Sequence, residues 1–211
     1  MTEYDNDAEP NDVYTDAMVM DENSTMYGHI GHRYDVGGFD EDDWYQVVTT
    51  QDGTLTITAE NNTGQYHTLT LYDSNGTTSL GSNSAYTTQT VVRKGLAAGT
   101  YYIRMSHYST TYFSGYSLTN LVTPPAEAND MEDNDSIPVA QPMLTNSSAE
   151  GHIGFRYNGA TYDEYDYYEL VLNQPGDLSA TLTFDPVMYH RLYLKSSSGT
   201  NLDSDEAYGE C

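Results

Sequence analysis

The stretch "GTLTITAE" (residues 53–60) alternates apolar side chains with threonines. Its apolar members are Leu55, Ile57 and Ala59. An alternation with a period of two predicts a β-strand that has one buried and one solvated face. The stretch "DLSATLTF" (residues 177–184) shows the same alternation, and its apolar members are Leu178, Ala180, Leu182 and Phe184. The sequence therefore predicts two half-buried strands of the same kind in distant parts of the chain.

The chain is a tandem duplication, because a shift of 123 residues brings its two parts into register. The stretch "GHIG" at residues 28–31 recurs at 151–154. An acidic segment with Glu9, Asn11 and Asp12 recurs as Glu132, Asn134 and Asp135, and Asp40, Asp43 and Tyr45 recur as Asp163, Asp166 and Tyr168. Thr, Tyr, Gly, Asn and Ser are abundant, which favours short strands joined by turns. The expected fold class is all-β, with two tandem jelly-roll-like β-sandwich domains, the second lacking its C-terminal strands.

The predicted domains are a first repeat at residues 1–122, a Pro-rich linker at 123–127 and an incomplete second repeat at 128–211. Repeat one continues for 36 residues after Tyr86, whereas only three residues follow the equivalent Tyr208. Two explanations stay open: the chain was cut or incompletely read, or a partner supplies the missing strands. Because an unpaired strand edge recruits other chains, self-assembly through the open edge of repeat two is an expectation.

Charge excludes several classes of partner. The chain has 32 acidic and 7 basic residues and a formal charge of -25. Nucleic acid and anionic membrane surfaces both require Lys/Arg patches, so neither is expected as a partner. No apolar run approaches the roughly 20 residues that a membrane span needs, so membrane insertion is not expected. The single cysteine, Cys211, permits no internal disulfide. Glycosylation triplets occur at Asn23, Asn61, Asn75, Asn134 and Asn146.

Each repeat carries two acidic clusters, and about 28 residues separate the last residue of the first from the first residue of the second. They are residues 7–12 and 40–43 in repeat one, and residues 130–135 and 163–166 in repeat two. Crowded carboxylates repel one another unless a cation lies among them. Calcium prefers carboxylate and carbonyl oxygens, while the lack of Cys and scarcity of His nearby disfavour zinc and copper. The alternative is ordinary surface acid in an acidic protein. Recurrence of the same residue types at the same spacing favours Ca²⁺.

This pattern resembles the bacterial pre-peptidase C-terminal domain family, which is related to the collagen-binding domains of secreted bacterial collagenases. The residues that carry the resemblance are "EPND" (9–12), "DEDDWY" (40–45), "LTLYDSNG" (69–76) and "GLAAGTYYIRM" (95–105). The resemblance implies a jelly-roll-like sandwich, secretion, and a non-catalytic role beside proteases or on surface proteins. It implies that the calcium ligands are Asp7, Glu9, Asn11, Asp12, Asp40 and Asp43, with Asp130, Glu132, Asn134, Asp135, Asp163 and Asp166 in repeat two. One departure is that Asp7 and Asp130 stand where the collagen-binding domains have Glu.

The predicted function is that of a non-enzymatic, calcium-stabilised extracellular repeat with a structural or adhesive role in a surface protein or extracellular filament. The alternative is an accessory module that binds collagen or polysaccharide for a secreted protease or other hydrolase. Catalytic motifs such as G-x-S-x-G and H-E-x-x-H are absent from the sequence, although glycosidase-like acid pairs remain open. The expected location is secreted or on the cell surface. Three interpretations stay open for Tyr108, Tyr112, Phe113 and Tyr116: a platform that binds glycan or protein, ordinary sandwich surface, or a subunit interface.

Overall fold

The chain forms two units in the computed structural model, which describes residues 7–32, 38–109, 111–125, 130–157, 161–184 and 189–208. Unit 1 comprises Met1–Asn129 with His152–Glu164, and unit 2 comprises Asp130–Gly151 with Tyr165–Cys211. The described residues form strands and two short 3₁₀ turns, η1 (Tyr14–Asp16) and η2 (Ile137–Val139). The predicted all-β fold is confirmed. Among these residues no helix is long and apolar enough to cross a membrane.

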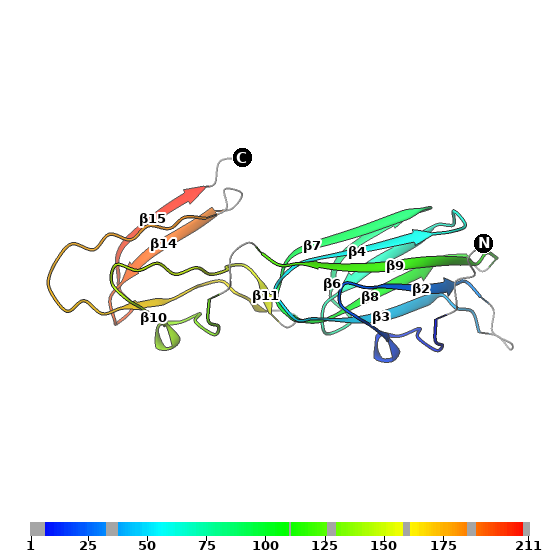
Figure 1. Cartoon of the computed structure of the whole chain (residues 1–211), viewed down its shortest axis with the longest axis horizontal. Coiled ribbons are helices and arrows are strands. Elements are labelled where there is room, and N and C mark those ends of the chain that lie inside the picture. Colours follow the sequence, from blue (N-terminus) through cyan, green and yellow to red (C-terminus); the bar gives the residue numbers. More distant parts are fainter. Residues whose placement is uncertain are drawn as a thin grey trace. The chain divides into compact units, whose positions relative to one another are not determined.

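Unit 1 is a sandwich of two sheets (Figure 1). The first sheet has the order β1 (Met18–Met20), β3 (Asp42–Thr49), β8 (Gly99–His107), β5 (His67–Tyr72) and β6 (Ser79–Ala85). The second has the order β12 (Thr161–Tyr162), β11 (Arg156–Tyr157), β7 (Thr88–Leu96), β4 (Gly53–Asn61), β9 (Ser114–Thr123) and β2 (Thr25–Ile30). Pairing is antiparallel except for β1 with β3 and β11 with β7.

The core of unit 1 lies between these sheets and contains alternate residues of both. The predicted strand at residues 53–60 is β4, and its three apolar residues are buried as expected. From the facing sheet, β3, β5 and β8 bury Tyr45, Val47, Leu69, Leu71, Tyr101, Ile103 and Met105. Burial of this apolar surface is the main stabilising term for the sandwich. Trp44 is also buried.

Unit 2 contains two small sheets. Strand β10 (Gln141–Met143) pairs in parallel with β13 (Tyr168–Leu170), as β1 pairs with β3 in unit 1. Strands β14 (Tyr189–Lys195) and β15 (Asn201–Tyr208) form an antiparallel hairpin. By the repeat offset, these two strands are the counterparts of β5 and β6.

The prediction of a strand at residues 177–184 is wrong for this structure. The segment belongs to no sheet, and Leu178 and Leu182 are exposed. Its counterpart β4 is a strand because it hydrogen-bonds to β7 on one side and β9 on the other. The described part of unit 2 contains no counterpart of β7, β8 or β9, so residues 177–184 have no neighbouring strand to pair with. That repeat two lacks its last strands stays a prediction.

The boundary predicted at residues 123–127 follows the end of a strand. Strand β9 ends at Thr123, and Pro124 and Pro125 follow without secondary structure. Residues 126–127 and Cys211 lie outside the described part of the chain. The division of the chain into domains at 122 and 128 stays a prediction.

The two adjacent valines of β7 provide a matched test of the core, since Val91 is 5% exposed and Val92 is 55% exposed. We expect Val91→Ala to lower the free energy of unfolding of unit 1 by about 2 kcal/mol, from lost burial and an imperfectly filled space. Val92→Ala should lower it by no more than about 0.5 kcal/mol, because that side chain faces water. Urea unfolding followed by fluorescence of Trp44, the only tryptophan, measures both. Equal losses in the two variants would contradict the assignment of the buried face.

Candidate metal centre

An N-terminal segment is held in the same way in both repeats, against the start of β3 in unit 1 and of β13 in unit 2. In unit 1 the backbone N–H of Trp44 donates to the carbonyl of Asn11 at 3.0 Å. In unit 2 the N–H of Tyr167 donates to the carbonyl of Asn134 at 3.1 Å. These bonds bring the "EPND" phrase and its copy beside the aspartates at the start of β3 and those that precede β13.

The repeated "GHIG" phrase fixes the aspartate loop through backbone bonds. Gly31 donates its N–H to the carbonyl of Asp40 at 2.9 Å, and Asp40 donates to the carbonyl of His32 at 3.0 Å. In the second copy Gly154 donates to Asp163 at 2.7 Å and Asp163 donates to Phe155 at 2.9 Å. Gly31 and Gly154 both adopt positive φ, at 89° and 84°, a backbone conformation that glycine adopts without steric cost.

The first glycine of each "GHIG" lies so close to neighbouring side chains that there is no room for a Cβ atom. A Cβ on Gly28 would lie 2.6 Å from the Tyr116 hydroxyl and 2.7 Å from the Tyr45 hydroxyl. A Cβ on Gly151 would lie 2.8 Å from Cγ of Asp130. Any larger residue would therefore displace the polar groups that surround each acidic cluster.

The acidic cluster of unit 1 contains three carboxylates from two segments. One oxygen each of Asp7, Glu9 and Asp43 lies within 4.8 Å of the others. The Asn11 side-chain amide donates to Asp7 at 2.9 Å, which holds the fourth member in contact with the cluster. Asp7 also accepts a bond of 3.3 Å from the backbone N–H of His29.

Two buried tyrosines support this cluster from the core side. The Tyr45 hydroxyl donates to Asp7 at 2.8 Å, and the Tyr116 hydroxyl donates to Asp43 at 2.5 Å. The hydroxyl oxygens lie 2.7 Å from each other. Burial raises the pKa of both tyrosines above the ordinary value, with the Asp43 carboxylate as the next cause, so both hydroxyls keep their protons. Sequence reasoning missed this role, although Tyr45 and Tyr168 occupy matching positions in the two repeats.

Several oxygens of the cluster and of the neighbouring Asp40 are buried without a hydrogen-bond donor. They are Oδ1 of Asn11, both carboxylate oxygens of Asp40 and Oδ1 of Asp43, in residues no more than 1% exposed. Buried polar atoms without partners cost free energy, and uncompensated buried carboxylates cost more. Such oxygens, crowded together, form a site suited to a cation.

The cost of burying these carboxylates raises the pKa values of Asp40 and Asp43. Burial raises the pKa of Asp40 to about 7, with repulsion from Glu9 as the next cause. Burial raises the pKa of Asp43 well above its ordinary value, and the negative charges of Asp7 and Asp40 raise it further. A proton or a cation relieves the same repulsion, so the two ligands compete for this site.

The cluster of unit 2 reproduces much of this arrangement. One oxygen each of Asp130, Glu132 and Asp166 lies within 4.8 Å of the others. The Asn134 amide donates to Asp130 at 2.7 Å, and the Tyr168 hydroxyl donates to Asp130 at 2.5 Å. Oxygens buried without a hydrogen-bond donor are Oδ1 of Asp130, both carboxylate oxygens of Glu132 and Oδ1 of Asn134.

Three predicted ligands, Asp12, Asp135 and Asp163, do not belong to either group of close carboxylate oxygens. Asp12 is exposed, and partial burial followed by repulsion from Glu41 raises its pKa. Asp135 is half-buried. Asp163 is fully buried and belongs to unit 1. Of the twelve predicted residues, the structure brings together four in each unit and places Asp40 among the charges that act on the first cluster.

All the donors gathered in these two clusters are oxygens, from carboxylates and a side-chain amide. Hard cations such as Ca²⁺ prefer this donor set, whereas zinc and copper sites are built largely from imidazole and thiolate. The residues therefore fit the ion that the sequence predicts.

The fold and the site together define an all-β sandwich domain with an acidic, oxygen-lined centre. Residues 41–107 match the family model of the bacterial pre-peptidase C-terminal domain, and this confirms the resemblance seen in the sequence.

Two solved structures are similar to this chain. The pre-peptidase C-terminal domain of a collagenase from Bacillus anthracis aligns at 19% identity and a TM-score of 0.38, covering 54% of this chain and 99% of that one. PliG of Aeromonas hydrophila, a periplasmic inhibitor of g-type lysozyme, aligns at 13% identity and a TM-score of 0.35, covering 51% and 99%. No curated protein matches the sequence.

The raised pKa of Asp40 predicts that the metal-free protein becomes less stable as pH rises, which is the opposite of the usual effect of a carboxyl group. A carboxyl whose pKa rises on folding stabilises the folded state while it is protonated, and that contribution is lost between pH 3.8 and about 7. We therefore expect the melting temperature of unit 1 in chelator to fall across this range. Asp40→Asn should flatten the fall, which separates the effect of this group from the general charge of the protein. A metal-free melting temperature that rises with pH, or an unchanged slope in the variant, would contradict the assignment.

Proposed function

We propose that this protein is a non-catalytic, extracellular structural or adhesive module whose sandwich domains are stabilised by Ca²⁺. The observation that carries the proposal is the duplicated cluster of three carboxylates and one asparagine, with the same amide and tyrosine hydrogen bonds in each unit. Oxygens buried without hydrogen-bond donors occur in both copies. Repetition of a costly arrangement favours a bound ion over incidental surface acid.

Calcium would join the N-terminal segment of unit 1 to strand β3. Asp7, Glu9 and Asn11 come from the N-terminal segment, while Asp43 comes from β3. A cation bound by both groups would join the start of the unit to its sheet and cancel repulsion between the carboxylates. We expect an affinity in the range of extracellular modules, on the order of 10⁻⁴–10⁻³ M or tighter.

A secreted or cell-surface location follows from this proposal, because sites of such affinity fill where calcium is abundant. The match to a family named for its position beside peptidases supports an accessory rather than a catalytic role. The acid clusters are assigned to metal, and no reaction is assigned to them.

A second candidate is an accessory module that binds collagen or a polysaccharide. Tyr108, Tyr112 and Phe113 follow β8 and are 78%, 56% and 60% exposed, so they could present aromatic surface to a polymer. The expectation that Tyr116 belongs to this platform is wrong, because its ring is fully buried and its hydroxyl bonds Asp43.

Removal of calcium tests the first proposal. We expect Ca²⁺ at about 100 times its dissociation constant to stabilise unit 1 by about 2.7 kcal/mol, and a chelator to abolish this gain. Asp43→Asn should remove most of the gain, since it deletes a charge at the centre of the cluster. Asp16→Asn, the same change at an exposed site, should leave it intact. Melting curves and calorimetric titration measure these effects, and a calcium-independent melting temperature would refute the proposal.

Sedimentation with insoluble polymers tests the second candidate. If it holds, the protein in calcium should co-sediment with collagen, chitin or cellulose. A variant with Tyr108, Tyr112 and Phe113 changed to alanine should bind at least ~10-fold more weakly, because stacked and buried aromatic area is lost. Tyr86→Ala, at another exposed tyrosine, is the control. Absence of binding to all three polymers would count against this role.

A further inference from the structure

The outer edge of β14 is open, whereas the same edge of its counterpart is occupied. In unit 1, β5 lies between β6 and β8 and pairs with both. In unit 2, β14 pairs with β15 and with no other described strand. An unpaired edge presents a row of backbone donors and acceptors to any strand of suitable pattern.

The sequence of β14 is self-complementary when it is read against itself in the opposite direction. The strand reads "YHRLYLK" (residues 189–195). Antiparallel pairing centred on Leu192 sets Tyr189 opposite Lys195 and Arg191 opposite Tyr193, each pair occurring twice. On the other face, His190 meets Leu194, and Leu192 meets its own copy. All four pairs on the first face join a cation to an aromatic ring, a favourable contact.

Other registers are less favourable. Centring the pair on Arg191 sets two guanidinium groups opposite each other, and centring it on Tyr193 sets Arg191 opposite Lys195. Like charges directly opposite each other destabilise a strand pair. A slip of the pairing by one residue would place polar positions of one strand against apolar positions of the other. Of these registers, the one centred on Leu192 alone combines matched faces with no facing like charges.

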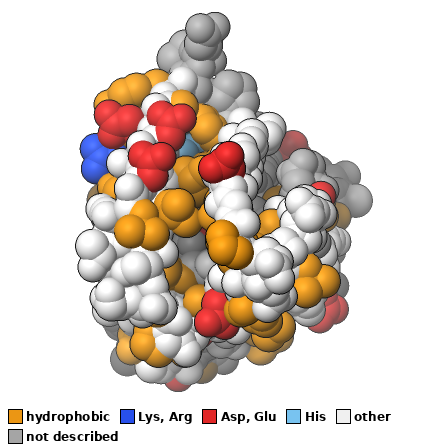
Figure 2. Space-filling model, turned by 90° about the vertical axis from the view of Figure 1, so that its left-hand side faces the viewer, with side chains coloured by type: hydrophobic (Ala, Val, Ile, Leu, Met, Phe, Trp, Pro, Cys, Tyr) orange, Lys and Arg blue, Asp and Glu red, His pale blue; other side chains and the backbone are white. Residues whose placement is uncertain are grey.

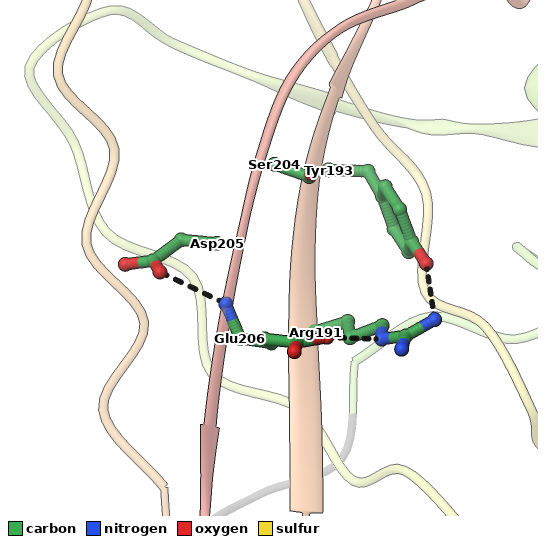
Figure 3. Close-up of a pocket in the computed structure, with 5 residues that line it drawn as sticks. All are labelled: Arg191, Tyr193, Ser204, Asp205 and Glu206. Carbon is green, nitrogen blue, oxygen red and sulfur yellow. Dashed lines mark hydrogen bonds and ion pairs between the residues drawn. The ribbon is translucent and has the colours of Figure 1, made fainter.

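The aromatic and basic residues of β14 already interact with one another on one face of the hairpin. Arg191 lies over the Tyr189 ring at 5.2 Å, and Lys195 lies over the Tyr193 ring at 5.4 Å. Arg191 also donates to Glu206 at 2.9 Å and to the Tyr193 hydroxyl at 3.2 Å (Figure 3). A hollow of about 410 Å³ borders this group and is lined by Arg191, Tyr193, Ser204, Asp205 and Glu206.

This face differs from its counterpart in unit 1. There Thr68 and Thr70 of β5 occupy the positions of Arg191 and Tyr193, and they bond Ser84 and Ser82 of the neighbouring strand. Arg191 and Lys195 are two of only seven basic residues in the chain. Their placement on the strand with an open edge gives unit 2 a specific pattern that unit 1 lacks.

The second strand of the hairpin, β15, is not packed against other described parts of the chain. All of β15 is exposed, including Leu202 at 63% and Tyr208 at 78%. Figure 2 shows hydrophobic side chains interspersed with acidic ones on the surface at the side of unit 2. A two-stranded hairpin without further partners is marginally stable in water, so additional pairing would stabilise it.

We infer that two copies of this chain associate through β14, antiparallel and centred on Leu192, to form a continuous sheet in the order β15–β14–β14–β15. A two-fold axis passes between the two Leu192 residues, as in other isologous dimers. The occupant of the edge is a second copy because this strand complements itself in charge and in face pattern.

Sedimentation in calcium, reductant and physiological salt tests this arrangement. Reductant prevents linkage through Cys211, and salt screens the repulsion between two acidic chains. The wild type should dimerise reversibly. Tyr193→Lys sets an ammonium opposite Arg191 of the partner subunit at two positions and should weaken the dimer at least ~10-fold. Ser204→Lys adds the same charge on β15, away from the edge, and should leave the dimer intact.

A cross-linking measurement locates the axis independently. In a Cys211→Ser background, Leu192→Cys should form a disulfide-linked dimer on mild oxidation, since directly opposed residues of antiparallel strands lie within disulfide range. Ser204→Cys in the same background should not. Calcium titration of the same samples separates loss of the dimer from loss of the metal.

Three outcomes would overturn the inference. The first is a monomer at every concentration. The second is a dimer that is unaffected by Tyr193→Lys and does not cross-link at residue 192. The third is a monomer that binds a synthetic peptide of residues 99–107 at β14, which would show that the edge receives a β8-like strand instead.

Discussion

The organising constraint of this protein is electrostatic: carboxylates lie beside one another where the start of each unit meets its sheet, and those of unit 1 are the more deeply buried. Burial and mutual repulsion both disfavour their charged forms, as the raised pKa values of Asp40 and Asp43 show. Much of the surrounding structure serves to hold them there. The glycines of "GHIG" allow close approach, the tyrosines donate from the core side, and a backbone bond to Asn11 fixes the N-terminal segment.

The two units show how local geometry can persist when the sheets around it differ. Around the acidic centre, the backbone bond from Tyr167, the amide bond from Asn134 and the hydroxyl bond from Tyr168 all have counterparts in unit 1. In contrast, residues 177–184 form no strand, although their pattern matches that of β4. The contacts that recur in both centres come from segments close in the chain, whereas a strand depends on neighbours supplied by distant segments.

This difference explains what the sequence could predict. Alternation identified β4, and the repeat offset identified the carboxylates that cluster in each unit. The offset could not show that Tyr116 turns inward to Asp43, because its strand has no copy in repeat two. Alternation likewise could not show that residues 177–184 lack a partner, because pairing is decided by the rest of the sheet. The exposure of Asp12 depends on the path of the backbone after Asn11, which residue types alone do not determine.

The parallel pairing of β1 with β3, and of β10 with β13, has a mechanical consequence. Each short strand follows directly after the acidic segment, so tension applied to the front of a unit reaches this ladder before it reaches the core. A pull along the strand direction loads the hydrogen bonds of such a ladder together rather than one after another. In each unit, a short parallel ladder thus lies between the acidic segment and the rest of the chain, and its hydrogen bonds would share a pull along the strand direction.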